Sequence, residues 1–276
     1  MPTQRTQELR QKAQALCAEL SQHVVLKEYW QAISVVLKGS TARGRADQYS
    51  DVDFVLFAED DAAPRIAHAY WQAGLSPRQD GFFLPLDNWV GHYHLEAIRD
   101  LQGYFAAADF PNAWEFSGAI ALHDPGQRFA HAVEAGMQGL FREPEIHIKE
   151  AYLQLQLTQN WLMQPLRRAD AVAVSLHTAK ILRLWCHLAY LLDERPYPHD
   201  KWLHTYLDTT RLGRNAGGLV AGYLTEAVKH PHVQPHHELM EYPQFRAGQE
   251  LIAAVVEFLK ADRGERPWID SWAEYV

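Results

Sequence analysis

Residues 37–57, LKGSTARGRADQYSDVDFVLF, place two carboxylates on a segment that otherwise has the composition of a buried β-strand. Side chains alternate between the two faces of a strand, so Asp51 and Asp53 are expected on one face, with Val52 and Phe54 on the other. Two like charges held side by side repel one another unless a positive charge lies between them. A divalent cation supplies that charge, and Mg²⁺ typically binds one or two carboxylates together with substrate phosphates. A cap or turn role would explain the first aspartate alone.

The Gly-Ser pair upstream of the aspartates has the properties of a phosphate-binding turn. Gly39 allows a backbone to approach a phosphate closely, and Ser40 offers a hydroxyl donor. If a helix begins at Ser40 or Thr41, its first amides face the same anion. Arg43 and Arg45 are candidate phosphate clamps. A triphosphate-binding turn beside paired aspartates indicates metal-assisted transfer to or from a nucleotide.

A third carboxylate would complete such a site, and Glu96 in HYHLEAI is the candidate. The alternative is a strand residue that faces solvent at a sheet edge. His92 and His94 alternate with Glu96, so all three are expected on one face, and either histidine is a candidate for lining an acceptor pocket. A second histidine cluster comprises His230, His232, His236 and His237. Neither set has the spacing of a zinc site.

Periodicity divides the chain into two domains, residues 1–142 and 143–276. In the first, strands and helices alternate, which favours an α/β or α+β unit. Its expected helices are 3–23 and 63–74, and its expected strands are 32–39, 52–58, 82–88, 90–98 and 118–124. The second domain is expected to be a helical bundle, with helices at 144–165, 170–193, 199–209, 214–230 and 237–260.

Bulk composition limits the classes of partner and compartment. Apolar residues make up 47% of the 276, enough for a sizeable core, and the net charge is −8, with an acidic excess in both halves. Proteins that follow a long nucleic acid usually present a basic face, so a small-molecule or protein partner is favoured. The N-terminal residues do not resemble a signal peptide, and no apolar run is long enough for a membrane span. Two cysteines far apart in sequence favour a reducing cytoplasm.

Gly39-Ser40, an interval of ten residues and Asp51-x-Asp53 resemble the signature of the DNA polymerase β-like nucleotidyltransferase superfamily. The fuller segment most resembles its small-molecule branch, which includes the aminoglycoside and lincosamide nucleotidyltransferases. That branch joins a mixed-sheet catalytic domain to a C-terminal helical domain, so an α+β fold of this kind is expected. The resemblance implies that the two aspartates bind Mg²⁺ (Mn²⁺ is the alternative) and that Gly39 and Ser40 hold the triphosphate. It implies that Glu96 is a metal ligand, a general base on the acceptor hydroxyl, or both.

The segment YPHDKWLHTYL, residues 197–207, allows two interpretations. Lys201 and Trp202 open a helix for which Asp200 is a candidate cap, and the lysine is then simply solvated. Relatives with this architecture, however, carry a similar stretch whose lysine is expected to reach the nucleotide phosphates across the domain cleft. Tryptophans are also candidates for stacking on a base or an acceptor ring, but core packing is favoured for Trp89, Trp161 and Trp202.

Together these features predict a Mg²⁺-dependent nucleotidyltransferase that transfers AMP from ATP to a hydroxyl of a small-molecule acceptor. An aminoglycoside-like cation suits the acidic chain. One alternative is an adenylyltransferase or antitoxin-like regulator that acts on a protein partner. A further alternative is a nucleotide-binding protein without catalytic activity. No oligomeric state is predicted.

Overall fold

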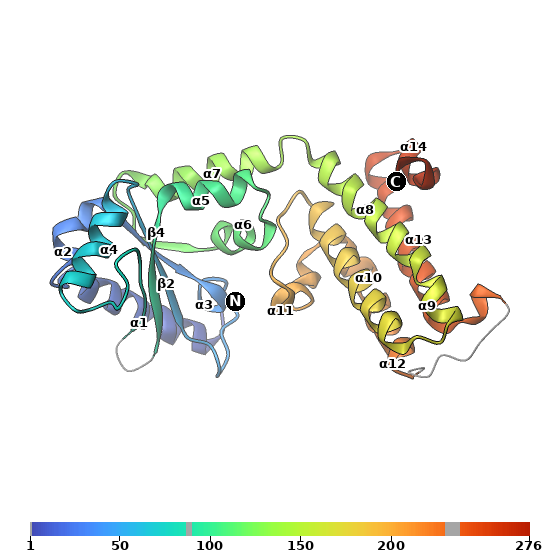
Figure 1. Ribbon diagram of the computed structural model, residues 1–276, viewed down its shortest axis with the longest axis horizontal. Helices are drawn as coiled ribbons and strands as arrows, with labels where there is room; N and C mark the ends of the chain where they lie inside the picture. Colours follow the sequence, from blue (N-terminus) through green and yellow to red (C-terminus); the bar gives the residue numbers. More distant parts are fainter. Residues whose placement is uncertain (1, 87–89, 230–237) are drawn as a thin grey trace. The chain divides into compact units, whose positions relative to one another are not determined.

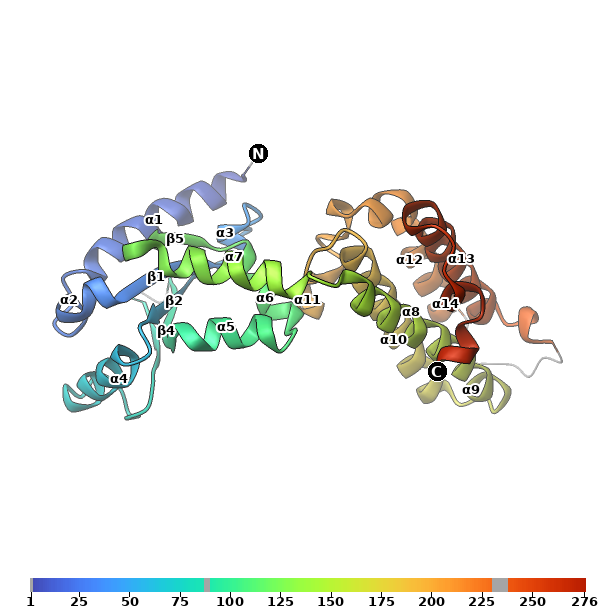
Figure 2. The same ribbon diagram turned by 90° about the horizontal axis from the view of Figure 1, so that it is seen from above.

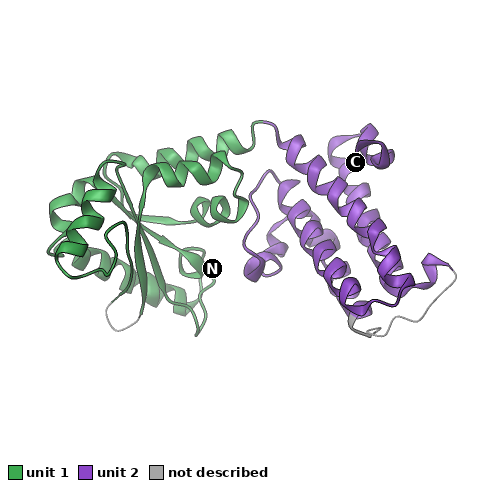
Figure 3. Ribbon diagram, viewed as in Figure 1, with its two compact units in different colours: residues 1–142 green, residues 143–276 purple. Residues whose placement is uncertain are grey.

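A mixed sheet of five described strands forms the centre of the first unit, residues 1–142 (Figures 1 and 3). The computed structural model describes residues 2–86, 90–229 and 238–276. The strand order is β3–β4–β2–β1–β5. The strand bounds are Ile33–Lys38 for β1, Val52–Ala58 for β2, Phe83–Pro85 for β3, Gly91–Ala97 for β4 and Ile120–His123 for β5. Strand β2 is parallel to β4 and antiparallel to β1, whereas β3 and β5 are antiparallel edge strands.

Helices cover both faces of this sheet (Figure 2). Val52, Phe54 and Leu56 pack in one core with helices α1 (Gln4–Leu20) and α4 (Ala62–Gln72). On the opposite face, the Phe57 ring contacts aromatic rings from α6 (Phe110–Ser117) and α7 (Arg128–Leu140), and α5 (Ile98–Ala106) packs against α7. Because β2 is covered on both faces, its residues are almost continuously apolar and Asp53 is its one charged residue.

Short helical segments occupy the connections of the first unit. These are α2 (Leu26–Tyr29), the 3₁₀ turn η1 (Trp30–Ala32), α3 (Gly39–Ala42) and the 3₁₀ turn η3 (Pro125–Gln127). The sequence interpretation did not include α5, α6 and α7. All three lie between or after strands whose alternation was the clearer signal, and α6 is only eight residues long.

The second unit, residues 143–276, is helical throughout its described part apart from connecting turns. Its long helices α8, α10, α12 and α13 pack on one another as a bundle (Figure 1). The α-helix bounds are Pro144–Trp161 for α8, Met163–Arg167 for α9, Ala171–Leu191 for α10, Asp200–Leu203 for α11, Arg211–Lys229 for α12, Pro243–Arg263 for α13 and Pro267–Asp270 for α14. The 3₁₀ turns are η4 (Leu207–Thr209), η5 (Leu239–Glu241) and η6 (Trp272–Tyr275). The predicted α+β class, a mixed-sheet domain followed by helices, is confirmed.

One predicted helix is wrong in extent. Residues 199–209 were expected to form a single helix, but α11 ends at Leu203 and is followed by the turn η4. The buried Tyr190 hydroxyl donates to the Leu203 carbonyl oxygen at 2.9 Å, and the Leu207 amide donates to His204 instead. A tertiary contact therefore takes the acceptor that a continuing helix would need.

In the described parts of the chain, no helix combines the length and the apolar character that a bilayer crossing requires.

Candidate active site

Asp51, Asp53 and His92 meet where β2 begins. Strands β2 and β4 are paired in the register that puts Asp53 beside His92. The His92 Nδ1 atom lies 3.4 Å from Oδ1 of Asp53 and 3.7 Å from Oδ2 of Asp51. One ligand atom from each residue lies within 4.8 Å of the others. All three side chains are between 34% and 44% exposed, so an ion can reach them from solvent.

This donor set fits a divalent cation. Two atoms that share one ion at protein-ligand distances of about 2.0–2.2 Å lie at most about 4.4 Å apart. The Asp51–Asp53–His92 group is therefore close to the required spacing. Two carboxylates and one imidazole would hold the ion, and a substrate phosphate would complete its coordination.

Glu96, the expected third carboxylate, lies elsewhere on the same face of β4. It is paired with Phe57, four residues beyond His92 and so about 13 Å further along the strand. Its Oε1 atom is 2.9 Å from His94 Nε2, and its Oε2 atom accepts a hydrogen bond from the Tyr104 hydroxyl at 3.1 Å. The side chain is only 18% exposed, so the alternative of a solvent-facing residue is wrong. An imidazole occupies the place expected for a third carboxylate.

The Glu96 carboxylate affects the protonation of the neighbouring Tyr104 hydroxyl. Burial, together with the negative charge of Glu96, raises the pKa of Tyr104 above its ordinary value. Tyr104 is therefore a hydrogen-bond donor to Glu96 throughout the physiological pH range. The carboxylate is held between two fixed partners, His94 and Tyr104.

Gly39 brings the predicted phosphate-binding turn against the Asp51–Asp53–His92 group. Its φ angle is +74°, and a Cβ atom added there would lie 3.3 Å from Oδ2 of Asp53. Glycine suits this position because the left-handed backbone and the close carboxylate both disfavour a side chain. Helix α3 begins at this glycine. The Ser40 hydroxyl donates to the Ser50 hydroxyl at 2.9 Å, and the Thr41 hydroxyl donates to the Asp51 carbonyl oxygen at 2.7 Å.

The two arginines of the loop differ in their surroundings. The Arg43 guanidinium lies 3.4 Å from the centroid of the Trp114 ring and donates to the Trp114 carbonyl oxygen. Arg43 thus holds α3 against α6. Arg45 follows α3, where its amide donates to the Ser40 carbonyl oxygen at 3.0 Å. Arg45 therefore lies beside the turn, whereas the guanidinium of Arg43 packs against Trp114 of α6.

In the second unit, Asp200 is not the cap expected of it. The N-cap of α11 is His199, without a side-chain cap bond, and Asp200 is the first residue of the helix. The Asp200 carboxylate instead forms a bidentate ion pair with Arg183, at 2.7 and 3.1 Å. Lys201 is exposed, with its ammonium 5.8 Å from the Trp202 ring centroid.

The tryptophan and histidine predictions have mixed outcomes. Trp161 is 51% exposed, with the Lys180 ammonium 5.9 Å from its ring centroid, so the core packing favoured for it is wrong. Trp202 is half-buried on α11. Trp89 and the cluster His230, His232, His236 and His237 lie outside the described residues.

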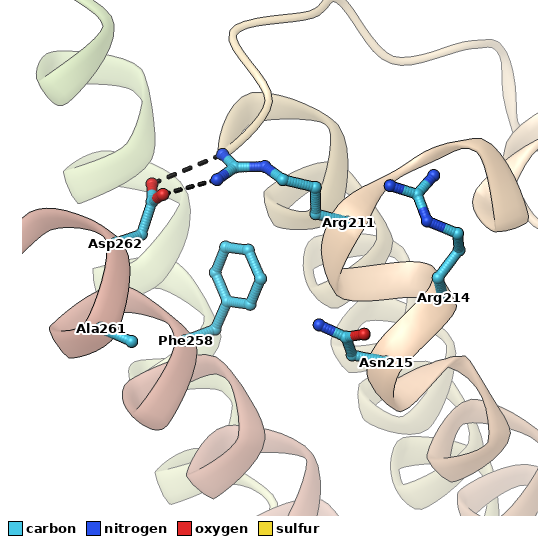
Figure 4. A pocket seen from close by; sticks show the side chains of 6 residues that line it. All are labelled: Arg211, Arg214, Asn215, Phe258, Ala261 and Asp262. Atoms are coloured by element: carbon cyan, nitrogen blue, oxygen red, sulfur yellow. Dashed lines mark hydrogen bonds and ion pairs between the residues drawn. The ribbon is translucent and has the colours of Figure 1, made fainter.

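A hollow lies between α12 and α13 in the helical unit (Figure 4). It is lined by Arg211, Arg214, Asn215, Phe258, Ala261 and Asp262. The Arg211 side chain is bound on several sides: Nε is 2.6 Å from Asp193, Nη1 is 2.5 Å from Asp262, and Nη2 donates to the Leu192 carbonyl oxygen. This arginine joins the ends of three helices, and the hollow is a structural junction.

A comparison with protein families identifies a nucleotidyltransferase segment in the first unit. Residues 24–78 match the family model described as "Nucleotidyltransferase domain". This range contains Gly39, Ser40, Asp51 and Asp53. No curated protein matches the sequence. Among solved structures, a nucleotidyltransferase-like protein from Exiguobacterium sibiricum 255-15 is similar, with a TM-score of 0.47, 11% identity, and coverage of 91% of this chain and 80% of that chain. The family match confirms the predicted enzyme class, a nucleotidyltransferase.

Proposed function

We propose that this protein transfers a nucleoside monophosphate, AMP from ATP, to a hydroxyl group of a small-molecule acceptor. The observation that carries this proposal is the Asp51–Asp53–His92 group beside the Gly39 turn, where Asp53 Oδ2 lies 3.3 Å from the position that a Cβ atom of residue 39 would take. Metal-binding groups next to a turn that admits a phosphate are the two parts that nucleotidyl transfer requires. Mg²⁺ or Mn²⁺ is the proposed cofactor.

Each residue of the site has a proposed role. Asp51, Asp53 and His92 hold the ion, which when bound would offset negative charge on the reacting phosphate and on its leaving group. Gly39 and Ser40, together with Arg45, bind the triphosphate. These groups orient the α-phosphate for in-line attack by the acceptor hydroxyl, with pyrophosphate as the leaving group.

Glu96 is proposed as the general base on the acceptor hydroxyl. It is a carboxylate on the same sheet face as Asp53, and this role requires the acceptor hydroxyl to lie within hydrogen-bond distance of Glu96 when the α-phosphate is bound. Its bonds to His94 and Tyr104 hold it in one orientation.

The acidic chain supports a cationic small molecule, such as an aminoglycoside-like compound, as the acceptor. The net charge is −8, and a long polyanion is disfavoured by that charge. We propose a cytoplasmic location from the two widely separated cysteines, both of which are buried.

Asp51→Asn and Asp53→Asn test the reaction. The full-length protein would be incubated with ATP, Mg²⁺ and a pooled acceptor library, and mass spectrometry would detect acceptors that gain one nucleotide monophosphate. Both variants should lose transfer by at least about 10²-fold while their melting temperatures stay the same or rise, because each removes one of two repelling charges. Full turnover by Asp53→Asn would exclude the proposed site. A mass gain on a protein would replace the small-molecule acceptor with a protein one.

A further inference from the structure

Glu115, on helix α6, contacts the proposed nucleotide-binding turn. Its Oε1 atom accepts a hydrogen bond from the Gly39 backbone amide at 2.7 Å. The N-cap of α3 is Lys38, which provides no side-chain acceptor. The first amide of α3 is therefore satisfied by a carboxylate 76 residues later in the chain. Sequence reasoning missed this residue, because no local pattern indicates which side chain faces Gly39.

A second contact joins the same two elements. Arg43, the C-cap residue of α3, places its guanidinium over the Trp114 ring and donates to the Trp114 carbonyl oxygen. A Cβ atom at Gly118 would overlap the carbon of this guanidinium, so the arginine fills the space beside that glycine. Helix α6 thus contacts both ends of α3: Glu115 binds the amide of the first residue, Gly39, and Trp114 packs against the C-cap residue, Arg43.

Helix α6 is itself held firmly in the first unit. Trp114 and Phe116, on either side of Glu115, are each only 3% exposed. The Phe116 ring packs edge-on against Phe57 of β2 and stacks on Tyr104 of α5. Because both neighbours are anchored in the core, the backbone at Glu115 has little freedom and the reach of its carboxylate is fixed.

We propose that Glu115 is a positioning residue that sets the Gly39 turn at its working distance from Asp53. This inference rests on the proposed function, in which the turn binds the nucleotide triphosphate. Gly39 lies between two carboxylates: Glu115 binds its amide, and Oδ2 of Asp53 lies 3.3 Å from the position that a Cβ atom would take. Glu115 therefore determines where the turn lies relative to the metal-binding group, and acts through Gly39 without itself contacting the metal.

The hydrogen bond from the Gly39 amide to Glu115 is tested in the ligand-free protein by amide hydrogen exchange at Gly39. In full-length Glu115→Ala the Gly39 amide should exchange about tenfold faster than in the wild type, since it loses a charge-assisted bond. Glu115→Gln retains a carbonyl oxygen as acceptor and should restore most of the protection. Glu134→Ala removes an exposed glutamate from α7 of the same unit and is the matched control. Unchanged exchange in Glu115→Ala would overturn the proposal.

Nucleotide binding then distinguishes positioning from other roles. Glu115→Ala should weaken the affinity for ATP with Mg²⁺ by about tenfold at a temperature well below its melting transition, and Glu115→Gln should restore it. Tighter ATP binding in both variants would instead make Glu115 a competing anion and overturn the proposal, as would an affinity that is unchanged. If the wild type binds no ATP, the proposed function fails, and the exchange experiment still decides whether Glu115 braces the turn.

Discussion

His92 gives the candidate metal site a nitrogen donor where an all-carboxylate site would have oxygen alone. Imidazole suits Mn²⁺ and later transition metals better than it suits Mg²⁺, which prefers oxygen ligands. The imidazole nitrogen lies within 3.7 Å of both aspartates, so its identity bears on which ion the group holds.

The His92 prediction concerns metal preference. By calorimetry on the nucleotide-free protein, the wild type should bind Mn²⁺ more tightly than Mg²⁺, and His92→Ala should lose about tenfold or more of the Mn²⁺ affinity. His92→Asp should gain Mg²⁺ affinity relative to Mn²⁺, because it supplies a third carboxylate. Equal affinities of wild type and His92→Ala for both ions would show that His92 is not a ligand.

Gly39 is the other residue whose identity is fixed by geometry. Gly39→Ala should reduce nucleotidyl transfer by at least about tenfold, because the left-handed backbone at this position disfavours a Cβ atom and the new Cβ crowds Oδ2 of Asp53. Gly74, at φ +70° with open space around it, is the matched control for backbone strain alone. Gly74→Ala should lower the melting temperature to a similar extent while transfer is retained. Equal loss of transfer in both variants would contradict the site-specific role.

Helix α10 contains a half-buried histidine, His187, that links stability to pH. The His187 ring stacks on Tyr197 with 3.6 Å between centroids. Burial lowers the pKa of His187 to about 4, while nearby Asp200 and Arg183 act in opposite directions. Below its ordinary pKa of 6.5 the unfolded chain takes up a proton that the folded helix resists, so stability falls as the pH drops from 6.5 to about 4.

The corresponding prediction is a change of slope. In chemical denaturation across this pH window, His187→Phe should flatten the dependence of the unfolding free energy by up to about 1.4 kcal/mol per pH unit, the value for one proton. Phenylalanine keeps an aromatic ring against Tyr197. His199→Gln, at an exposed position, should leave the slope as in the wild type. An unaltered slope in His187→Phe would show that His187 titrates normally.

The Arg211 junction joins the C-terminal end of α10, the start of α12 and the end of α13. Arg211→Met should lower the unfolding free energy by about 1–3 kcal/mol, because Asp193 and Asp262, which are 10% and 21% exposed, each lose the Arg211 guanidinium, and Asp262 keeps only Arg263. Arg214→Met is the control: this residue lines the same hollow but donates mainly to a carbonyl oxygen. Chemical denaturation measures both, and equal effects would contradict a special role for Arg211.

The ion pair between Arg211 and Asp262 also makes the stability of the protein depend on pH. The hydrogen bond from Arg211 lowers the pKa of Asp262 below 3.8. Its contribution to stability is therefore present above pH 3.8 and is lost as the pH falls through the lower folded-state value. In Arg211→Met this part of the acid dependence should be smaller, because only Arg263 then remains to lower the pKa of Asp262.

At the scale of the whole molecule, each of the two units has buried apolar residues of its own among the described residues. A Lys201 variant tests whether the second unit contributes a residue to the reaction proposed for the first. We propose, from the resemblance of HDKW, that this exposed lysine binds the nucleotide phosphates. Lys201→Ala should then raise the apparent constant for ATP and slow turnover, with a loss of about 10- to 100-fold in catalytic efficiency. Steady-state kinetics measures this, with Lys180→Ala as a control on the same unit. Wild-type kinetics would leave Lys201 as a solvated side chain.

The sequence by itself determined the parts that depend on local pattern. An apolar strand interrupted by Asp51 and Asp53, preceded at a fixed interval by Gly39 and Ser40, indicated the enzyme class and the face of the strand on which both carboxylates lie. Helical periodicity punctuated by prolines indicated the helical second half. Short-range geometry is sufficient for these features, because a strand alternates its own side chains whatever lies next to it.

Only the tertiary structure decided what lies opposite those residues. The register between parallel strands β2 and β4 puts His92, and not Glu96, beside Asp53. No local sequence pattern sets this register, because parallel strands are joined by a long connection and not by a tight turn. Helix α6, absent from the sequence interpretation, supplies the Glu115 carboxylate to Gly39 from 76 residues away. Neither contact can be inferred from one strand or one turn, because each depends on where a distant element packs against the sheet.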